Sequence, residues 1–124
     1  MNSVSPSGQQ KDSVTLFPAM TNKLLVLTTT ASRAEARKIA SALVERKLAA
    51  CVNIIANIES VYRWKGKVEN AEEWLLFIKT DRKHFPKVRD AIKELHSYEL
   101  PECIAFTITE GSKQYLQWLS DSLI

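Results

Sequence analysis

Residues 50–67, ACVNIIANIESVYRWKGK, decide how the rest of the chain is organised. From Val52 to Trp64 the even positions are mostly apolar or aromatic and the odd positions are largely polar, which predicts a β-strand with one buried face. At about 3.3 Å per residue such a strand would span roughly 43 Å, whereas most strands span about 17–20 Å. Either a bulge kinks it, or its far half, residues 60–64, leaves its own domain. We therefore interpret the stretch as an oligomerisation arm, because Tyr62 and Trp64 need another chain to cover them.

Length and composition predict a single globular domain. The chain has 124 residues, 45% of them hydrophobic and 25% charged, which is enough for a real core. Its 17 basic and 14 acidic residues are interspersed, so the net charge of +3 is not the basic patch of a nucleic-acid-binding protein. No apolar run approaches the ~20 residues of a membrane span. We expect neither nucleic acid nor a membrane as partner.

The N-terminal segment, residues 1–22, is rich in Ser, Gln, Pro and Gly and lacks the apolar centre of a signal peptide. We expect a disordered lead-in there, followed by one domain at residues 23–124. Cys51 and Cys103 fall in predicted strands, where we expect buried free thiols. These features favour a reduced, cytoplasmic protein.

Capping and turn signals divide the rest of the chain into elements. Ser32 and Glu35 have the spacing of a capping box and predict the start of a helix. Lys65-Gly66 predicts a tight reversal, and Pro86 suits the first turn of a second helix. The apolar stripe expected on the first helix is Ile39, Ala40, Leu43 and Val44. The other strands are expected at residues 23–30, 74–80 and 103–109, and the last helix is expected to start at Gly111-Ser112.

The resulting order is β-α-β-β-α-β plus one short C-terminal helix. It predicts an α+β fold of the ferredoxin-like type, a sandwich in which an antiparallel sheet carries its helices on one face. RNA-recognition domains share this order but need aromatic residues on their central strands, and residues 24–30 contain none. The sequence has no Gly-rich phosphate loop, His-Glu-x-x-His helix or Cys-x-x-Cys pair, so we expect a protein that is not an enzyme.

Five short motifs, in order and in register, resemble those of one family. The resemblance is to the CutA family of divalent-cation tolerance proteins and extends over residues 23–124. It implies a homotrimer like that of the PII-type signalling proteins, with the long hairpin extended and packed across subunits. The motifs are KLAACVN at residues 47–53, YRWKGK at 62–67, Lys79-Thr80, HSYELPE at 96–102 and YLQW at 115–118.

The resemblance also implies a role in the response to divalent metal ions. Members of the family are linked to tolerance of copper and other divalent metals, some bind copper, and animal members are linked to the anchoring of a membrane enzyme. We expect no required cofactor and weak binding of Cu(II) or another divalent cation. Two alternatives stay open: a PII-like signalling trimer that binds a small anionic ligand in clefts between subunits, and a structural or anchoring scaffold.

The candidate metal ligands are His96, Glu99 and Glu102. Imidazole suits copper, zinc or nickel, and carboxylates suit harder ions. In copper-binding members of the family the ligands are a Cys on the first strand and a His pair; the matching positions here are Thr28 and Leu95, with only His96 retained. This departure predicts that a thiol-assisted copper site is absent. The alternative role for His96 is to end a helix and interact with its dipole.

The other candidates are aromatic or polar residues of the five motifs, which could line a cleft between subunits. A lysine in such a cleft would favour an anionic ligand. The alternatives are interface packing for the aromatic side chains and solvated surface charge for the others. His84 lies in a basic run, and we expect it to be exposed. The cleft or interface candidates are Glu59, Tyr62, Trp64, Lys67, Lys79, Tyr98 and Trp118.

Overall fold

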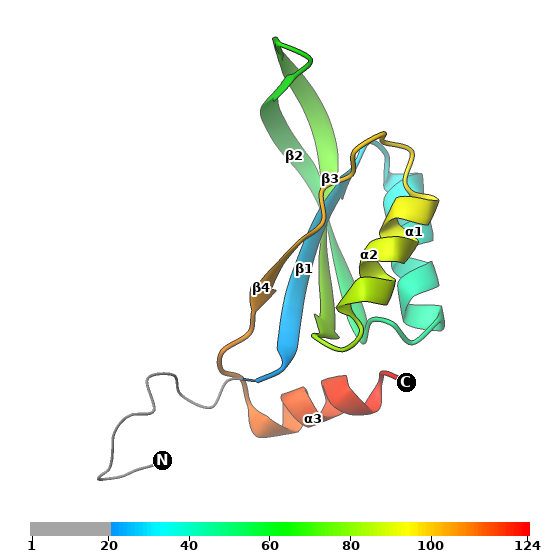
Figure 1. The fold of residues 1–124 in the computed structure, drawn as a ribbon, viewed down its shortest axis with the longest axis vertical. Coiled ribbons are helices and arrows are strands. Elements are labelled where there is room, and N and C mark those ends of the chain that lie inside the picture. Colours follow the sequence, from blue (N-terminus) through cyan, green and yellow to red (C-terminus); the bar gives the residue numbers. More distant parts are fainter. Residues whose placement is uncertain (1–20) are drawn as a thin grey trace, which may run out of the picture.

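The computed structural model describes residues 21–124, so the lead-in expected at residues 1–22 lies almost entirely outside the described residues. Four strands of the described chain form one antiparallel sheet in the order β2-β3-β1-β4, which places β1 in the interior as predicted. Helices α1 (Arg33–Glu45) and α2 (Phe85–Leu95) cover one face, and α3 (Lys113–Asp121) lies across one end (Figure 1). This arrangement confirms the ferredoxin-like fold. The strands are β1 (Lys23–Thr30), β2 (Cys51–Trp64), β3 (Lys67–Asp81) and β4 (Ile104–Thr107).

The core lies between the sheet and the two helices that cover it. Ile39 and Leu43 on α1 are fully buried, as their helical spacing predicted. Val44 is 41% exposed, so its place on the predicted stripe is wrong, because it lies about 100° around the helix from Leu43. Burying one such aliphatic side chain contributes about 1.5–3 kcal/mol. From the sheet and α2 the fully buried apolar residues are Val26, Leu76, Ile78, Val88 and Ile92.

Strand β2 contains a bulge, and its far half projects beyond the helices (Figure 1). Ile54 pairs with Leu76, whereas Ile58 pairs with Glu73, so β2 carries one extra residue between these pairs. Because side chains alternate along a strand, this shift moves the even-numbered residues to the other face of the sheet. The expectation of one continuous buried face is therefore wrong. Both consequences that the strand's length suggested, a bulge and a projecting end, occur together.

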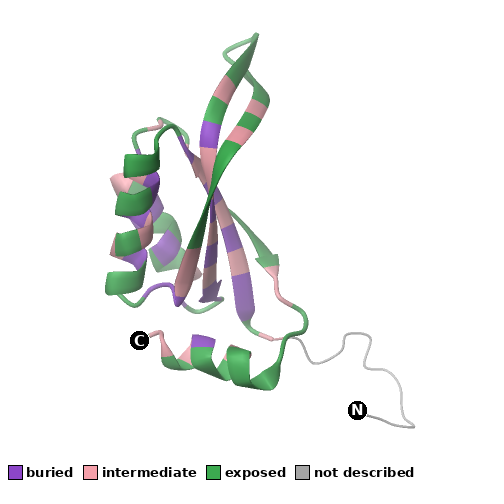
Figure 2. Ribbon diagram, turned by 180° about the vertical axis from the view of Figure 1, so that it is seen from behind, coloured by how far each residue is buried: buried purple, intermediate pink, exposed green. Residues whose placement is uncertain are grey.

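Left-handed backbone conformations mark the bulge and the turn of this hairpin. Asn57 lies in the bulge with φ 64°, while Lys65 and Gly66 form the turn with φ 51° and 83°. Two consecutive positive φ values suit the right-handed twist of a two-residue hairpin, which confirms the predicted reversal. Strand β3 is about twice as long as predicted, because residues 68–73, three of which are glutamates, are held in it by pairing with β2. The hairpin beyond the bulge is mostly exposed (Figure 2).

The sheet face opposite the helices carries large apolar side chains that stay exposed in the described chain. Leu27 pairs with Phe77 on one side and with Ile104 on the other, and Leu25 pairs with Phe106. Ile104 and Phe106 are 46% and 53% exposed, although both are large and apolar. Strand β4 is also shorter than the predicted 103–109. An apolar face of this kind normally meets a partner.

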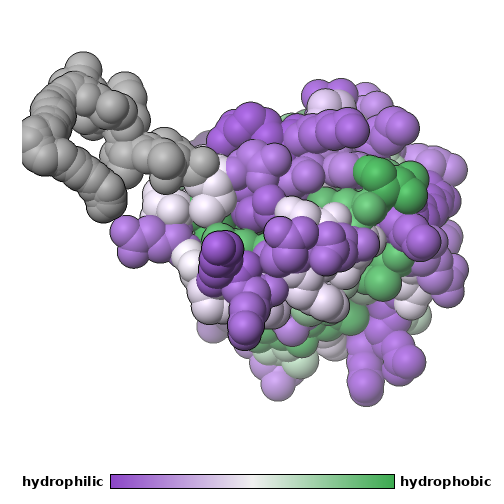
Figure 3. Space-filling model, turned by 90° about the horizontal axis from the view of Figure 1, so that it is seen from below, coloured by the Kyte–Doolittle hydropathy of each residue, from purple (hydrophilic) through white to green (hydrophobic). Residues whose placement is uncertain are grey.

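The end of the molecule covered by α3 differs most from the sequence-based expectation. Leu119 is the one buried residue of α3, whereas Tyr115 and Trp118 are 42% and 46% exposed. Seen from this end, hydrophilic side chains surround smaller hydrophobic patches (Figure 3). His84 is only 7% exposed, with Nδ1 2.7 Å from Asp81 Oδ1 and Nε2 against Ile124 O. The prediction of an exposed His84 is wrong, because the chain after α3 returns to cover it.

The two cysteines bear on the redox environment of the protein, and the helices bear on whether it could span a membrane. Cys51 and Cys103 are both free thiols, as expected, but they are half-buried rather than buried. Among residues 21–124 no helix combines the length and apolar character needed to cross a membrane.

Candidate functional site

Glu35 ties the start of α1 to the loop at residues 96–102. Ser32 caps α1 by accepting a hydrogen bond from the Glu35 N–H at 3.1 Å, as the capping-box spacing predicted. The reciprocal hydrogen bond of a capping box, from the Ser32 N–H to the Glu35 carboxylate, does not form. The Glu35 carboxylate instead accepts from Ser97, from its N–H at 2.6 Å and its hydroxyl at 3.1 Å. Glu35 therefore positions the loop that follows α2.

His96 ends α2 and is buried, with 9% of its surface exposed. Its Nε2 lies 2.6 Å from the Thr29 carbonyl oxygen, and the Tyr98 N–H donates to its Nδ1 at 3.1 Å. A carbonyl only accepts and an N–H only donates, so both ring nitrogens are engaged when Nε2 carries the hydrogen. A metal ion at His96 would have to displace one of these two partners.

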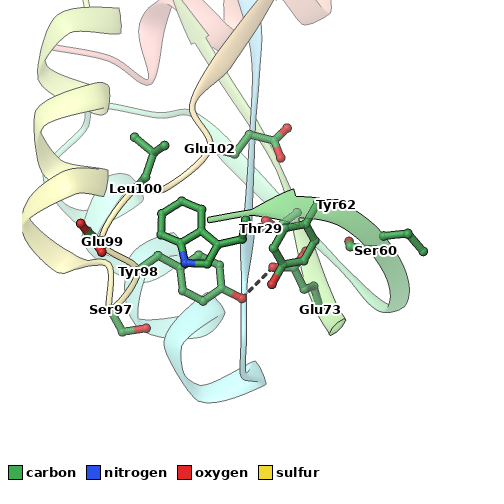
Figure 4. A pocket seen from close by; sticks show the side chains of 11 residues that line it. Thr29, Ser60, Tyr62, Glu73, Ser97, Tyr98, Glu99, Leu100 and Glu102 are labelled. Atoms are coloured by element: carbon green, nitrogen blue, oxygen red, sulfur yellow. Dashed lines mark hydrogen bonds between the residues drawn. The ribbon is translucent and has the colours of Figure 1, made fainter. Parts of the chain in front are cut away.

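A cavity of about 700 Å³ lies between this loop and the base of the hairpin (Figure 4). Three of the described residues that line it are glutamates, and none is Lys, Arg or His. The cavity is therefore acidic, which attracts cations and repels anions. It is lined by Thr29 of β1, Ser60, Val61, Tyr62 and Trp64 of β2, Glu73 of β3, and Ser97, Tyr98, Glu99, Leu100 and Glu102 of the loop.

Glu73 is the buried carboxylate of this acidic pocket, with 6% of its surface exposed. The Tyr98 hydroxyl donates to it at 2.6 Å (Figure 4). Burial and this hydrogen bond raise the pKa of the Tyr98 phenol well above its ordinary value. Glu102 as a whole is exposed in the single chain, but its carboxyl group is partly buried. This burial, and to a smaller extent the nearby charge of Glu73, raises the pKa of Glu102. The two carboxylates thus lie close enough to repel each other.

The acidic pocket brings together five of the predicted site residues. Tyr62 and Trp64 come from the hairpin, and Tyr98, Glu99 and Glu102 come from the loop. No three His, Cys, Asp or Glu side chains of residues 21–124 are arranged to hold a metal ion. His96 therefore does not join Glu99 and Glu102 in a ligand set within one chain.

Besides His96, four further candidates lie outside the acidic pocket. Glu59 pairs across the hairpin with Glu72, and Lys67 pairs with Trp64 beside the turn. Lys79 Nζ lies 3.4 Å from the Tyr115 hydroxyl on α3. Trp118 packs against Tyr115, with ring centroids 5.3 Å apart. Neither lysine therefore contributes a positive charge to the pocket.

Glu73 is the site residue that sequence reasoning missed. It lies just before the strand predicted at 74–80, in the segment that also carries Glu69 and Glu72. One signal was available: Glu73 lies two residues before Leu75, so in a strand the two share a face. Its burial depends on Tyr98, which is 25 residues away in the chain.

The sheet order, the projecting hairpin and the pocket at its base define a ferredoxin-like α+β protein with an extended β2-β3 ribbon. A family model described as CutA1 divalent ion tolerance protein matches residues 24–122, and the chain belongs to this family. The family is one of divalent-cation tolerance proteins, which confirms the resemblance that the five motifs carried.

Relatives and solved structures agree with this assignment. The divalent-cation tolerance protein CutA of Thermus thermophilus is 48% identical over 98 residues, 79% of this chain and 95% of the relative. Human protein CutA is 46% identical over 84 residues, 68% of this chain, but the chain spans only 47% of its length. The Thermus thermophilus structure superposes with a TM-score of 0.81 at 46% identity, covering 82% and 99% of the two chains. CutA1 of Oryza sativa gives 0.82 at 38% identity, covering 85% and 96%.

Proposed function

We propose that the protein serves divalent-cation tolerance as a homotrimer that binds divalent cations weakly in the acidic pocket. The charge of that pocket supports this proposal: it has Glu73, Glu99 and Glu102 and, among the described residues, no basic side chain. Carboxylate oxygens are among the ligands that hard divalent cations prefer.

The proposal of a trimer rests on aromatic and apolar side chains that are exposed in a single chain. Tyr62 and Trp64 are 43% and 36% exposed where they line the acidic pocket, and the sheet face around Phe106 is uncovered in the described chain. Neighbouring copies would cover both surfaces. They would also supply the further ligands that a metal ion needs, since one chain does not hold a complete set.

Binding of Cu(II) would disturb the existing hydrogen bonds of this site more than binding of Mn²⁺ would. Imidazole suits Cu(II), but His96 already donates toward Thr29 and accepts from Tyr98. Binding of Mn²⁺ through carboxylates leaves these bonds intact, whereas Cu(II) binding at His96 breaks one of them. We therefore place the main cation contacts at Glu73 and Glu102.

The alternatives receive less support. A small anionic ligand would meet three carboxylates in the acidic pocket, and Lys67 and Lys79 lie elsewhere. A scaffold role is compatible with the exposed aromatic hairpin but makes no use of the negative charge of the pocket. We propose binding rather than catalysis, since the sequence has none of the catalytic motifs that we sought.

We also propose a cytoplasmic location, which the two free thiols support. Relatives differ in this respect. The Arabidopsis thaliana relative is named chloroplastic, and the Archaeoglobus fulgidus structure is described as periplasmic.

Calorimetric titration with Mn²⁺ and with Cu(II), on protein whose trimeric state is verified by light scattering, tests the proposal. Glu73→Gln keeps an oxygen acceptor for Tyr98 while removing the charge, and we expect Mn²⁺ binding to weaken about tenfold or more. Glu94→Gln is the matched control, because this exposed glutamate of α2 lies outside the pocket. His96→Ala should leave Mn²⁺ binding unchanged.

Two results would overturn the cation-binding part of the proposal. One is the absence of heat with either metal on a verified trimer, which would move the assignment to a scaffold. The other is equal weakening by Glu73→Gln and Glu94→Gln, which would reduce the effect to general surface charge. A monomer in light scattering would refute the trimer directly.

A further inference from the structure

A second cavity, of about 420 Å³, lies beside the first turns of α1. Arg33 and Arg37 come from the helix, and Ile54, Ala56 and Trp74 come from the hairpin. All five lie on the helix-covered side of the sheet, near the bulge. This cavity shares no lining residue with the acidic pocket. We call it the arginine cavity.

The local structure explains how the arginine cavity forms. Arg33 and Arg37 are four residues apart, so they lie on the same side of α1, one turn from each other. The bulge places the small Ala56 opposite this helix, near the point where β2 carries its extra residue. Ile54 and Trp74 add apolar walls. The result is a space with two guanidinium groups on one side and apolar side chains on the other.

The positive charge of the arginine cavity has no partner among the described residues. Neither arginine takes part in an ion pair within residues 21–124. Glu35, the acidic residue in the first turn of α1, is engaged by Ser97. The N-terminal end of this 13-residue helix adds its own partial positive charge beside Arg33.

Two further carboxylates bear on the charge balance. Glu72 shares a face of β3 with Trp74, two residues away, and pairs with Glu59 across the hairpin. Neither forms an ion pair with an arginine of the described chain. Their proximity predicts that they weaken anion binding without abolishing it, which makes Glu72 a useful second variant.

We propose that the arginine cavity binds an oxyanion carried on a flat apolar ring, such as an aromatic phosphate or carboxylate. Guanidinium groups match the planar geometry of two oxyanion oxygens and form the strongest charged hydrogen bonds in proteins. The Trp74 ring and the aliphatic walls provide the surface against which a ring packs. The site is separate from the acidic pocket and of opposite charge.

The test follows the indole N–H signal of Trp74 by NMR on the full chain, assigned by its loss in Trp74→Phe. Phenyl phosphate and benzoate are the probes, since they separate a phosphate from a carboxylate preference. Inorganic phosphate tests the oxyanion alone, and phenol tests the ring alone. We expect a saturable shift with at least one aromatic anion, weaker binding of inorganic phosphate and no saturation with phenol.

Two charge variants decide the assignment. Arg33→Gln/Arg37→Gln should weaken binding by at least about tenfold, because charged hydrogen bonds are lost. Arg46→Gln is the matched control: Arg46 caps the other end of α1 and is 45% exposed on its side chain. Glu72→Gln should tighten binding. All four arginine and glutamate positions are exposed, so thermal melting should confirm that the variants fold.

Equal weakening in Arg46→Gln and in the double variant would overturn the proposal, as would saturation by phenol or no shift with any probe. None of these results bears on the acidic pocket. Mn²⁺ titration of the double variant should match the unmodified protein, which keeps the two sites experimentally distinct.

Discussion

Strands β2 and β3 belong to two regions with different energetics. In the body of the domain, under α1 and α2, Leu76 and Ile78 are fully buried. In the arm, residues 58–73 beyond the bulge, Val61 and Val68 are 66% and 63% exposed on strands that pair equally well. A hydrogen-bonded ladder can therefore extend without burial, but an isolated two-stranded ribbon is only marginally stable in water. The body has its own buried core, whereas the arm would be covered only in the proposed trimer.

The strongest test of this difference between body and arm removes Trp64, the aromatic side chain nearest the turn. Trp64→Ala should lower stability by about 3–5 kcal/mol per subunit, because the ring is buried between chains in the proposed trimer. Chemical denaturation combined with light scattering measures both stability and assembly. An unchanged trimer with an unchanged midpoint would show that the arm needs no cover.

In the body, Leu43→Ala provides the corresponding test. The side chain is fully buried within one chain, so its loss should cost about 2–5 kcal/mol. Light scattering should show that Leu43→Ala leaves the proposed trimer assembled, whereas Trp64→Ala should weaken its assembly. Loss of assembly in Leu43→Ala equal to that in Trp64→Ala would contradict the division into body and arm.

Tyr98→Phe tests the contact that joins the two regions. Without the phenol hydroxyl, the buried Glu73 carboxylate loses its donor, and stability should fall by about 1–3 kcal/mol. The raised pKa of Tyr98 means that the folded state favours the neutral phenol. This contribution is complete below the ordinary pKa of 10.0 and is lost as the pH rises above it. Denaturation series between pH 8 and about 11 should show a smaller alkaline loss in Tyr98→Phe.

The smallest expected effect lies in the core of the body, at Thr28. Its hydroxyl is buried and has no hydrogen-bond partner among the described residues. Thr28→Val removes an unpaired polar group at nearly constant volume, so stability should rise by about 1 kcal/mol. Calorimetric melting measures the change. A lower melting temperature would mean that the hydroxyl has a partner outside the described contacts.

Sequence reasoning succeeded where a local pattern has one structural outcome. The capping serine, the turn at Lys65-Gly66 and the buried face of α1 around Ile39 all follow from contacts within a few residues. It failed where a contact joins distant segments. The burial of His84 depends on Ile124, and that of Glu73 depends on Tyr98.

The candidate site was predictable only in part, for the same reason. The motifs at residues 62–67 and 96–102 identified the hairpin and the loop whose side chains line the acidic pocket. They did not indicate that His96 turns toward Thr29, or that the two lysines lie elsewhere. These details depend on contacts between segments that are far apart in the chain, such as His96 with Thr29 and Lys79 with Tyr115.

The sequence by itself determined the order of elements, the ferredoxin-like fold and the family, because hydrophobic period, caps and turn residues act over short distances. Only the tertiary structure decided where charge accumulates. It gathered three glutamates in one cavity and two arginines in another, although the chain's acidic and basic residues are interspersed. The physical reason is that the charge of a cavity depends on which strands and loops lie next to each other in space. One extra residue in β2 changes the face on which the later side chains of that strand lie.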